Sequence, residues 1–537
     1  MKMNYVIFLI ASMVIIFASN FFGPTEQPPV SDIKVKQKAE SEFSISKEPY
    51  EVEENLLEER QFSTDKYVSF STPLISGKIS QTGGYITELK LRKHYKAPES
   101  FEPIEIMDKN EFFSKTIVKA KDINIPKDIT FTTSANQISV SNGSQQLRLL
   151  AKVGSINIEK ILVFNDSTYG IEQKIILTNK SRSNLVFRIF EESVGNIDGP
   201  EQWIMGYLLE DDMETVDSIP SETEKIKGDF SWYGFSKKYF LTSNILSDGE
   251  KTLKYNKFSK NTLRTLLSYK TISLMPGSQY VSSSTLFVGP KNPEVLKGFG
   301  KEFNKAHDLG WFGWLASPLE DLLKICNKFV NNFGVGIILV TILIRLLFLP
   351  LTVKSMMSMK KMQAKMALMK PELDAIKEKY KDDKATQNSE IMKVYSKQGM
   401  NPLSSLSGCL PMLIQIPVFV ALYNVLLYSL DLRHSTFLWI NDLSSPEVLF
   451  DIPGTGIPFR FLPLIMGISW FLTQKLTPPN PGADEFQTKI FQYMPIMFTV
   501  MFWGLPSGLI LYWTVSNIIS IFQQLYINKK FNKMQGA

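Results

Sequence analysis

One arginine lies inside an apolar segment that is long enough to cross a lipid bilayer. Residues 334–353 are otherwise uncharged, and Arg345 is the twelfth of these twenty residues, while a helix needs about 20 to span. A charge near mid-depth costs roughly 2.5–3.5 kcal/mol unless it is solvated or paired. The other candidate spans contain no Asp or Glu. The sequence therefore predicts a wet cavity, within a membrane protein, that receives a guest.

The first apolar run, residues 5–22, directs the following chain across a membrane. A cleaved signal peptide needs small residues at its exit, and the stretch from Ala18 to Phe22 is a poor cleavage site. We therefore favour an uncleaved transmembrane signal anchor at 1–22 over a cleaved peptide. Residues 23–60, with several prolines and many charges, bury too little to fold alone and read as a flexible linker.

Composition narrows the function classes. The net charge of +6 in 537 residues gives no reason to invoke nucleic acid. The two cysteines, Cys326 and Cys409, fall beside or within membrane segments, which argues against a disulfide framework. The three histidines (His94, His307 and His434) are too scattered for a zinc site. We expect no metal and no cofactor.

Residues 61–300 show period-two patterns separated by turn signals. Residues 156–175 alternate around an Asn165–Ser167 turn, and 137–150 bracket Asn142–Gly143, a strong hairpin signal. Many short strands at turn spacing predict a β-sandwich, which the preceding apolar run would export. It contains no phosphate loop or nucleophile elbow. The aromatic cluster at 232–235 reads as core rather than as a ligand surface.

Residues 301–333 lead from the sandwich to the membrane. From Pro318 to Phe333, leucines and aromatics fall largely on one face, while Glu320, Asp321 and Lys324 take the other. This pattern predicts an amphipathic helix lying on the outer leaflet. The alternative is a helix that packs on the sandwich.

A lysine-rich segment follows the predicted span 334–353. Residues 351–407 contain 11 Lys, no Arg and 6 Asp plus Glu, and the positive-inside rule places such a loop in the cytoplasm. A methionine-rich seam with steps of three and four predicts a helical hairpin over 354–402, which turns at Asp382–Lys384. The seam either holds the hairpin together or contacts varied partners.

Four further spans complete the predicted topology. We expect spans at 403–430 and 459–475 and two more, 490–503 and 507–527, because the last apolar block of 37 residues is interrupted near Pro506. The connections are an outer loop at 431–458, a cytoplasmic loop at 476–489 and a short cytoplasmic tail at 528–537. The predicted fold class is thus an α-helical polytopic membrane protein with six transmembrane helices, both termini cytoplasmic, and an exported all-β domain.

Several polar residues accompany Arg345 in the spans. Thr341 precedes it by one helical turn, and further polar groups occur at Gln415, Tyr423, Thr499, Tyr512, Thr514, Ser516 and Asn517. Polar residues in spans face the bundle interior or a cavity, or join helices. We assign Thr499, Thr514 and Ser516 to helix joining, and Arg345 to a cavity, because a guanidinium has five donors to satisfy.

Three motifs resemble a known family. Asn401–Leu403, the stretch GCLPMLIQIPVF at 408–419, and LPSGLILYW at 505–513 followed by Ser516–Asn517 are similar to the YidC/Oxa/Alb family of membrane protein insertases. The layout resembles the Gram-negative YidC form of that family. The resemblance covers residues 330–527 most closely.

The resemblance implies five core spans around a hydrophilic groove, open to the cytoplasm and to lipid and closed outside. It implies an insertase or chaperone rather than an enzyme, located in the cell inner membrane. It further implies nascent membrane proteins and the bilayer as partners, with a Sec-type translocon and the ribosome as further candidates. The groove residues carried over or chosen from the spans are Arg345, Thr341, Gln415, Tyr423, Tyr512, Trp513 and Asn517. Trp513 stands where the family commonly has tyrosine.

Two other classes are weaker fits. A transporter using Arg345 as an anion site would show two repeated halves with broken segments, and no convincing repeat occurs. A membrane-tethered enzyme would need a catalytic constellation in 61–300, and the sequence offers none.

Overall fold

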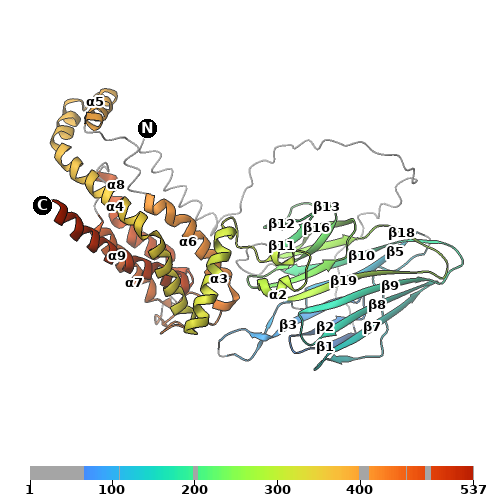
Figure 1. Cartoon of the computed structure of the whole chain (residues 1–537). Helices are drawn as coiled ribbons and strands as arrows, with labels where there is room; N and C mark the ends of the chain where they lie inside the picture. Colours follow the sequence, from blue (N-terminus) through green and yellow to red (C-terminus); the bar gives the residue numbers. More distant parts are fainter. Residues whose placement is uncertain are drawn as a thin grey trace. The chain divides into compact units, whose positions relative to one another are not determined.

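The chain forms a β domain and a helical unit (Figure 1). The computed structural model describes residues 66–535 except 99, 108, 122, 197–203, 398–409, 455, 457 and 478–484. The β domain comprises the described residues up to Lys93 and from Glu105 to Gly289, and the helical unit comprises His94–Ile104 and the chain from Pro290 onward. The predicted anchor at 1–22 and linker at 23–60 lie outside the described residues.

The β domain contains two sheets, and most of their neighbouring strands run antiparallel. The larger sheet has the order β13 (Glu224–Gly228), β16 (Lys251–Ser259), β17 (Thr262–Ser268), β10 (Leu185–Asn196), β5 (Phe112–Ala120), β3 (Ile86–Tyr95), β2 (Ile75–Ser80), β1 (Tyr67–Ser71) and β6 (Gln137–Ser139), with β18 (Ile272–Leu274) beside β10 and β4 (Pro103–Glu105) beside β3. The smaller sheet has the order β12 (Asp212–Val216), β11 (Met205–Leu209), β14 (Phe230–Ser236), β15 (Phe240–Leu246), β19 (Gln279–Pro290), β9 (Gly170–Asn179), β8 (Ile156–Asn165) and β7 (Ser144–Val153).

The two sheets share one core, as in a β-sandwich. Phe70 of β1 stacks on Phe164 of β8 at a ring-centroid distance of 4.8 Å, and these strands belong to different sheets. Trp232 and Tyr233 are fully buried, so the aromatic cluster at 232–235 belongs to the core. The predicted sandwich is confirmed, because alternating side chains of both sheets meet in this interior.

Of the two hairpins predicted from local turn signals, one is confirmed and one is wrong. β8 and β9 pair antiparallel around the 165–167 turn, and β2 pairs with β3 across Gly83–Gly84. The hairpin predicted over 137–150 is wrong. Gly143 does adopt a positive φ of 76°, but β6 pairs in parallel with β1 and β7 pairs with β8, so pairing with distant strands overrides the local signal.

The helical unit is built around its longest and its last helix. Its elements are α2 (Pro293–Lys297), η2 (Phe303–Ala306), α3 (Gly313–Val330), α4 (Phe333–Lys379), α5 (Lys384–Lys397), α6 (Leu410–Tyr428), η4 (Leu430–Leu432), β20 (Phe450–Asp451), β21 (Pro458–Phe459), α7 (Leu462–Leu476), α8 (Glu485–Met501), η5 (Phe502–Gly504) and α9 (Ser507–Gln535). Helix α9 contacts α4, α6 and α7, and α3 contacts α4 and α6.

Helix α4 runs without a break through the predicted span and into the predicted hairpin. Its 47 residues correspond to about 70 Å at 1.5 Å per residue, more than twice a ~30 Å hydrocarbon core. Among the described residues, α4 is the helix whose length and composition suffice to cross a membrane, and Gln415–Tyr428 is a shorter apolar stretch. The six-span topology stays a prediction.

The methionine seam joins α4 to α5. Met369 and Leu373 of α4 are buried against Val394 of α5, and Met366 and Tyr395 pack around them. Asp383 caps the start of α5 by accepting from the backbone N–H groups of residues 385 and 386. In this structure the seam therefore holds the hairpin together.

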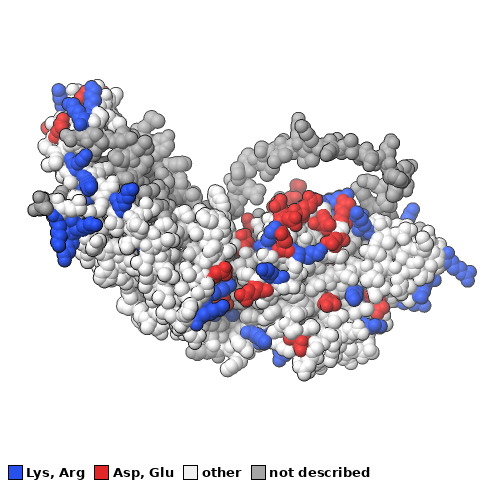
Figure 2. All heavy atoms as spheres, in the orientation of Figure 1, with Lys and Arg blue, Asp and Glu red and all other residues white. Residues whose placement is uncertain are grey.

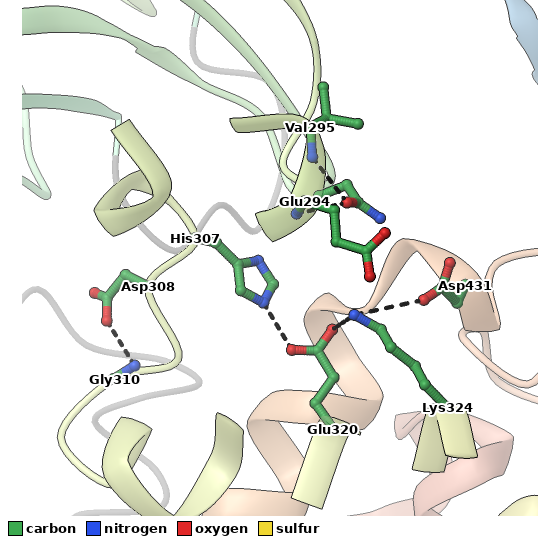
Figure 3. Close-up of polar contacts among 9 residues, drawn as sticks. Glu294, Val295, His307, Asp308, Gly310, Glu320, Lys324 and Asp431 are labelled. Carbon is green, nitrogen blue, oxygen red and sulfur yellow. Dashed lines mark hydrogen bonds and ion pairs between the residues drawn. The ribbon is translucent and has the colours of Figure 1, made fainter. Parts of the chain in front are cut away.

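The polar face predicted for α3 is only partly solvated. Glu320 is 5% exposed, and its two oxygens lie 3.0 Å from His307 Nε2 and 3.1 Å from Lys324 Nζ (Figure 3). Lys324 also reaches Asp431 at 4.0 Å. The assignment of Glu320 and Lys324 to a water-exposed face is corrected, because one side of α3 packs against other helices. A separate stripe with Trp314 and Phe329 is exposed.

Candidate functional site

Arg345 of α4 reaches across to α9. Its Nε donates to Ser516 Oγ at 3.0 Å, and Nη2 makes a short contact with the same oxygen. Sequence reasoning assigned Ser516 to helix joining, and this contact between α4 and α9 is of that kind, but the prediction did not indicate that Arg345 is its partner. A signal was available, because Ser516 follows Tyr512 by four residues and so shares its helix face.

The guanidinium keeps unused donor capacity. Nη1 has no hydrogen-bond partner among the described residues. No carboxylate of the described residues forms an ion pair with Arg345. The side chain is half-buried. A guanidinium offers five N–H donors, so this one can still bind water or a polar guest.

A second polar contact joins α6 to the same face of α9. Gln415 Nε2 donates to Tyr512 OH at 2.5 Å. Tyr512 is 3% exposed and lies one turn before Ser516. Helices α4, α6 and α9 thus bring Arg345, Gln415, Tyr512 and Ser516 into one polar group, which we call the Arg345 cluster.

Two predicted site residues face elsewhere. The buried Thr341 donates its hydroxyl to the Ile337 carbonyl of its own helix at 2.6 Å, so the structure gives it no bond to Arg345. Asn517 Nδ2 donates to Ser469 Oγ of α7 at 3.1 Å, which links α9 to α7. Both bonds satisfy polar groups within or between helices, as expected for membrane segments.

The two remaining predicted residues belong to aromatic contacts. Trp513 lies 4.7 Å from the Phe419 ring, 5.4 Å from Trp470 and 5.1 Å from Phe502. Tyr423 lies 6.3 Å from Phe419. Trp513 therefore bridges α6, α7 and the α8–α9 turn. Its neighbours are aromatic rings, whereas those of Tyr512 are the polar residues of the Arg345 cluster.

The space beside the Arg345 cluster is apolar towards the beginning of α4. A small cavity there is lined by Leu323, Ile337, Val340, Leu422, Leu426 and Tyr512. The cluster thus has an apolar boundary at this end. Figure 2 shows Lys and Arg gathered at the opposite end of the helical unit, near α5, and a mainly uncharged surface between.

The fold and the cluster define a class of protein: a helical membrane unit with a polar group between its helices, joined to a β-sandwich. Comparison with known proteins gives the family. The family described as "60Kd inner membrane protein" matches residues 325–534, and "YidC periplasmic domain" matches residues 67–322.

Proteins with known names match this sequence over most of its length. "Membrane protein insertase YidC" of Pelobacter propionicus is 36% identical over 87% of each chain. The protein of the same name from Geotalea daltonii is 32% identical over 98% of this chain and 99% of its own. A solved structure, "Active YidC insertase crystal structure with the first transmembrane domain resolved", covers 86% of this chain and 92% of its own, at 18% identity and a TM-score of 0.36.

The chain belongs to the YidC family of membrane protein insertases. It is an inner-membrane protein with a periplasmic domain, it serves the insertion of other membrane proteins, and it is not an enzyme. The resemblance predicted from the motifs is confirmed.

Proposed function

We propose that the Arg345 cluster is the polar wall of a groove that receives the hydrophilic flank of a nascent membrane protein. The supporting observation is the half-buried guanidinium whose Nη1 keeps no protein partner among the described residues. Such a charge is expensive in lipid. It is retained at lower cost where water or a guest can complete its hydrogen bonds.

The energetic logic needs no nucleotide. A guest span gains free energy when its apolar surface leaves water, at about 25 cal/mol per Å². The obstacle is the polar flank, which must cross a dry core. A wet groove that reaches Arg345 from the cytoplasm shortens that dry path, and the apolar boundary beyond Tyr512 limits it.

The aromatic contacts suggest where the guest span leaves. Trp513 bridges α6 and α7, and Tyr423 lies on the adjoining face of α6. These rings offer a flat apolar wall to a sliding helix. Thr341 and Asn517 support the wall from behind by satisfying polar groups on α4 and between α9 and α7.

The topology proposed with this groove has six spans and both termini in the cytoplasm. The basic end of the helical unit (Figure 2) supports this orientation, because cytoplasmic loops are rich in Lys. In this orientation the α4–α5 hairpin projects into the cytoplasm, where the guest emerges from the ribosome, and makes the first contact with the guest. A Sec-type translocon and the ribosome remain candidate partners, and α3 with its exposed Trp314 and Phe329 lies on the outer leaflet.

Substitutions within the Arg345 cluster test the proposal. We expect Arg345→Ala to slow insertion of guests with acidic or polar translocated tails at least tenfold in reconstituted vesicles. Ser516→Ala should have a smaller effect, and Arg345→Lys should retain part of the rate because it keeps the charge but not the fork.

A control exists on α9, the helix that carries Ser516. Thr514 donates to its own helix at Ile510 O, 2.7 Å away, so Thr514→Val should insert guests at the wild-type rate. Equal rates for Arg345→Ala and Thr514→Val would remove the guanidinium from the mechanism.

A further inference from the structure

A chain of ion contacts fastens α3 to two other segments (Figure 3). His307 Nε2 lies 3.0 Å from one oxygen of Glu320, and the other oxygen lies 3.1 Å from Lys324 Nζ. Lys324 Nζ also lies 4.0 Å from Asp431 in η4. We call these four side chains the His307 network. It joins α3 to the segment that precedes it and to the segment that follows α6.

The segment that carries His307 is itself anchored. Asn424 of α6 donates to Leu309 O at 2.7 Å, and a Cβ placed on Gly310 would lie 3.0 Å from the same amide nitrogen. Gly310 has a positive φ of 73°, which glycine adopts at no steric cost. His307 therefore stands at a fixed point against which α3 is held.

The charge of the His307 network is balanced when His307 carries a proton. One ammonium and two carboxylates leave a net charge of −1, and an imidazolium brings it to zero. The side chains of His307 and Glu320 are 9% and 6% exposed, so water compensates little of an excess charge. Histidine is the side chain whose charge ordinarily changes between pH 5 and 8. The balance of the network therefore depends on pH.

Two further acidic groups lie near the network, and neither supplies a cation. Glu294 of α2 acts electrostatically on Asp431 and adds negative charge. Asp308 accepts from Gly310 N at 2.7 Å, on the side away from the His307 ring (Figure 3). Both groups leave the requirement for a second positive charge unchanged.

Basic side chains close to these segments are engaged elsewhere. Arg433, two residues after Asp431, donates to Lys96 O at 3.2 Å. Lys305 forms an ion pair with Glu302. The network therefore gains its second positive charge from a proton on the imidazole.

Helix α3 carries the effect of the network to the Arg345 cluster. Leu323, next to Lys324 in the sequence, is 2% exposed and lines the small apolar cavity together with Tyr512. A Cβ placed on Gly336 of α4 would lie 3.3 Å from Leu323 Cδ1, so α3 packs closely on the helix that carries Arg345. Dense interiors transmit small displacements, so a shift of α3 changes the packing beside Tyr512.

We propose that His307 and Glu320 are positioning residues for insertion. A proton on His307 holds α3 tightly against α4 and α6, and loss of that proton loosens α3 and with it the packing around Tyr512. The insertion rate then follows the pH on the side of the membrane that α3 faces. The link from α3 to the insertion rate rests on the proposed groove, and the link from His307 to α3 does not.

Hydrogen exchange of α3 tests the link from His307. The full chain would be reconstituted in vesicles and measured at pH 5.5 and 8.0, with each rate corrected for the intrinsic pH dependence of exchange. We expect the α3 amides to be protected at least fivefold more strongly at pH 5.5. His307→Gln keeps a hydrogen-bond donor but takes up no proton, so its protection at the two pH values should agree within twofold.

The matched control is His434→Gln. His434 lies outside the His307 network and burial lowers its pKa, so this variant should retain the fivefold difference. A wild-type difference below twofold, or a fivefold difference that persists in His307→Gln, would overturn the proposal. Ring-nitrogen NMR shifts of labelled histidine, assigned by the signal missing from His307→Gln, report the charge directly. A His307 ring that keeps one charge state from pH 5.5 to 8.0 would also overturn it.

Insertion in the same vesicles tests the link to the groove. Only the pH on the side that α3 faces would be changed. Wild type should insert a polar-tailed guest at least threefold more slowly at pH 8.0 than at pH 5.5, and His307→Gln should differ less than twofold. A wild-type rate that ignores pH while α3 protection changes would refute the link through Leu323 to Tyr512. Normal insertion by Arg345→Ala would instead refute the groove, and the exchange result would stand.

Discussion

A buried lysine makes the stability of the β domain depend on pH. Lys160 of β8 is fully buried, and its Nζ donates to Ser114 O at 2.5 Å and to Thr116 Oγ1 at 3.1 Å. Burial lowers the pKa of Lys160 from 10.5 to about 8, although the nearby Glu191 opposes the shift. The cause is the loss of water around the ammonium.

The sign and size of the effect follow from this difference. Below pH 8 both the folded and the unfolded chain hold the proton, so the Lys160 contribution is constant. Between pH 8 and 10.5 the unfolded chain still holds a proton that the folded domain has lost, so stability rises with pH. The full shift is worth about 3 kcal/mol, and the part between pH 7.5 and 9.5 about 2 kcal/mol.

To test this, we would replace Lys160 by Met. The free energy of unfolding of residues 66–290 would be measured with urea at pH 7.5, 8.5 and 9.5 for wild type and variant. Titrating groups that do not interact with Lys160 cancel in the difference between wild type and variant. We expect wild type to gain about 2 kcal/mol over the variant across this range. Parallel pH profiles, within about 0.5 kcal/mol, would refute the claim that Lys160 is held by burial at a lowered pKa.

Two further predictions concern the helical unit. Leu373→Ala should destabilise the α4–α5 hairpin by roughly 2–5 kcal/mol, because a buried leucine is lost; amide hydrogen exchange in α5 should accelerate, and Leu368→Ala, at an 82% exposed site on the same helix, should leave it unchanged. Glu320→Gln should weaken the attachment of α3 by about 3 kcal/mol, because it removes the carboxylate that contacts both His307 and Lys324. Burial favours the neutral acid, but His307 and Lys324 outweigh burial and lower the pKa of Glu320. The stabilisation by the wild-type carboxylate is therefore present above the ordinary carboxyl pKa and is lost as the pH falls through the lowered pKa. Hydrogen exchange of α3 against Asp321→Asn, an exposed neighbour, reports it.

Arg345 could be predicted from sequence because its charge conflicts with its neighbours. An arginine among nineteen uncharged residues is a strong local anomaly, and it needs no tertiary information. Its partner could not be chosen in the same way. A serine in a span is compatible with a helix-joining role or a cavity role, and only the contact between α4 and α9 distinguishes Ser516 from Thr514.

Other misses have the same origin in distant contacts. The periodicity of α3 separates apolar from polar residues, but it does not reveal that His307 and Asp431 come from other segments to bury Glu320 and Lys324. Likewise, Asn142–Gly143 predicts a turn correctly, with Gly143 at positive φ. It does not predict that β6 finds its partner in β1.

Water access at position 345 tests the groove most directly. In a Cys326→Ala, Cys409→Ala background, Arg345→Cys would be treated with a membrane-impermeant thiol reagent from either side of oriented vesicles, beside Leu347→Cys on the same helix. Leu347 is 72% exposed, but a thiol facing lipid stays protonated and unreactive. The account predicts reaction of Arg345→Cys from the cytoplasmic side alone and none of Leu347→Cys. An Arg345→Cys thiol that reacts only from the periplasmic side, or from neither, would contradict it.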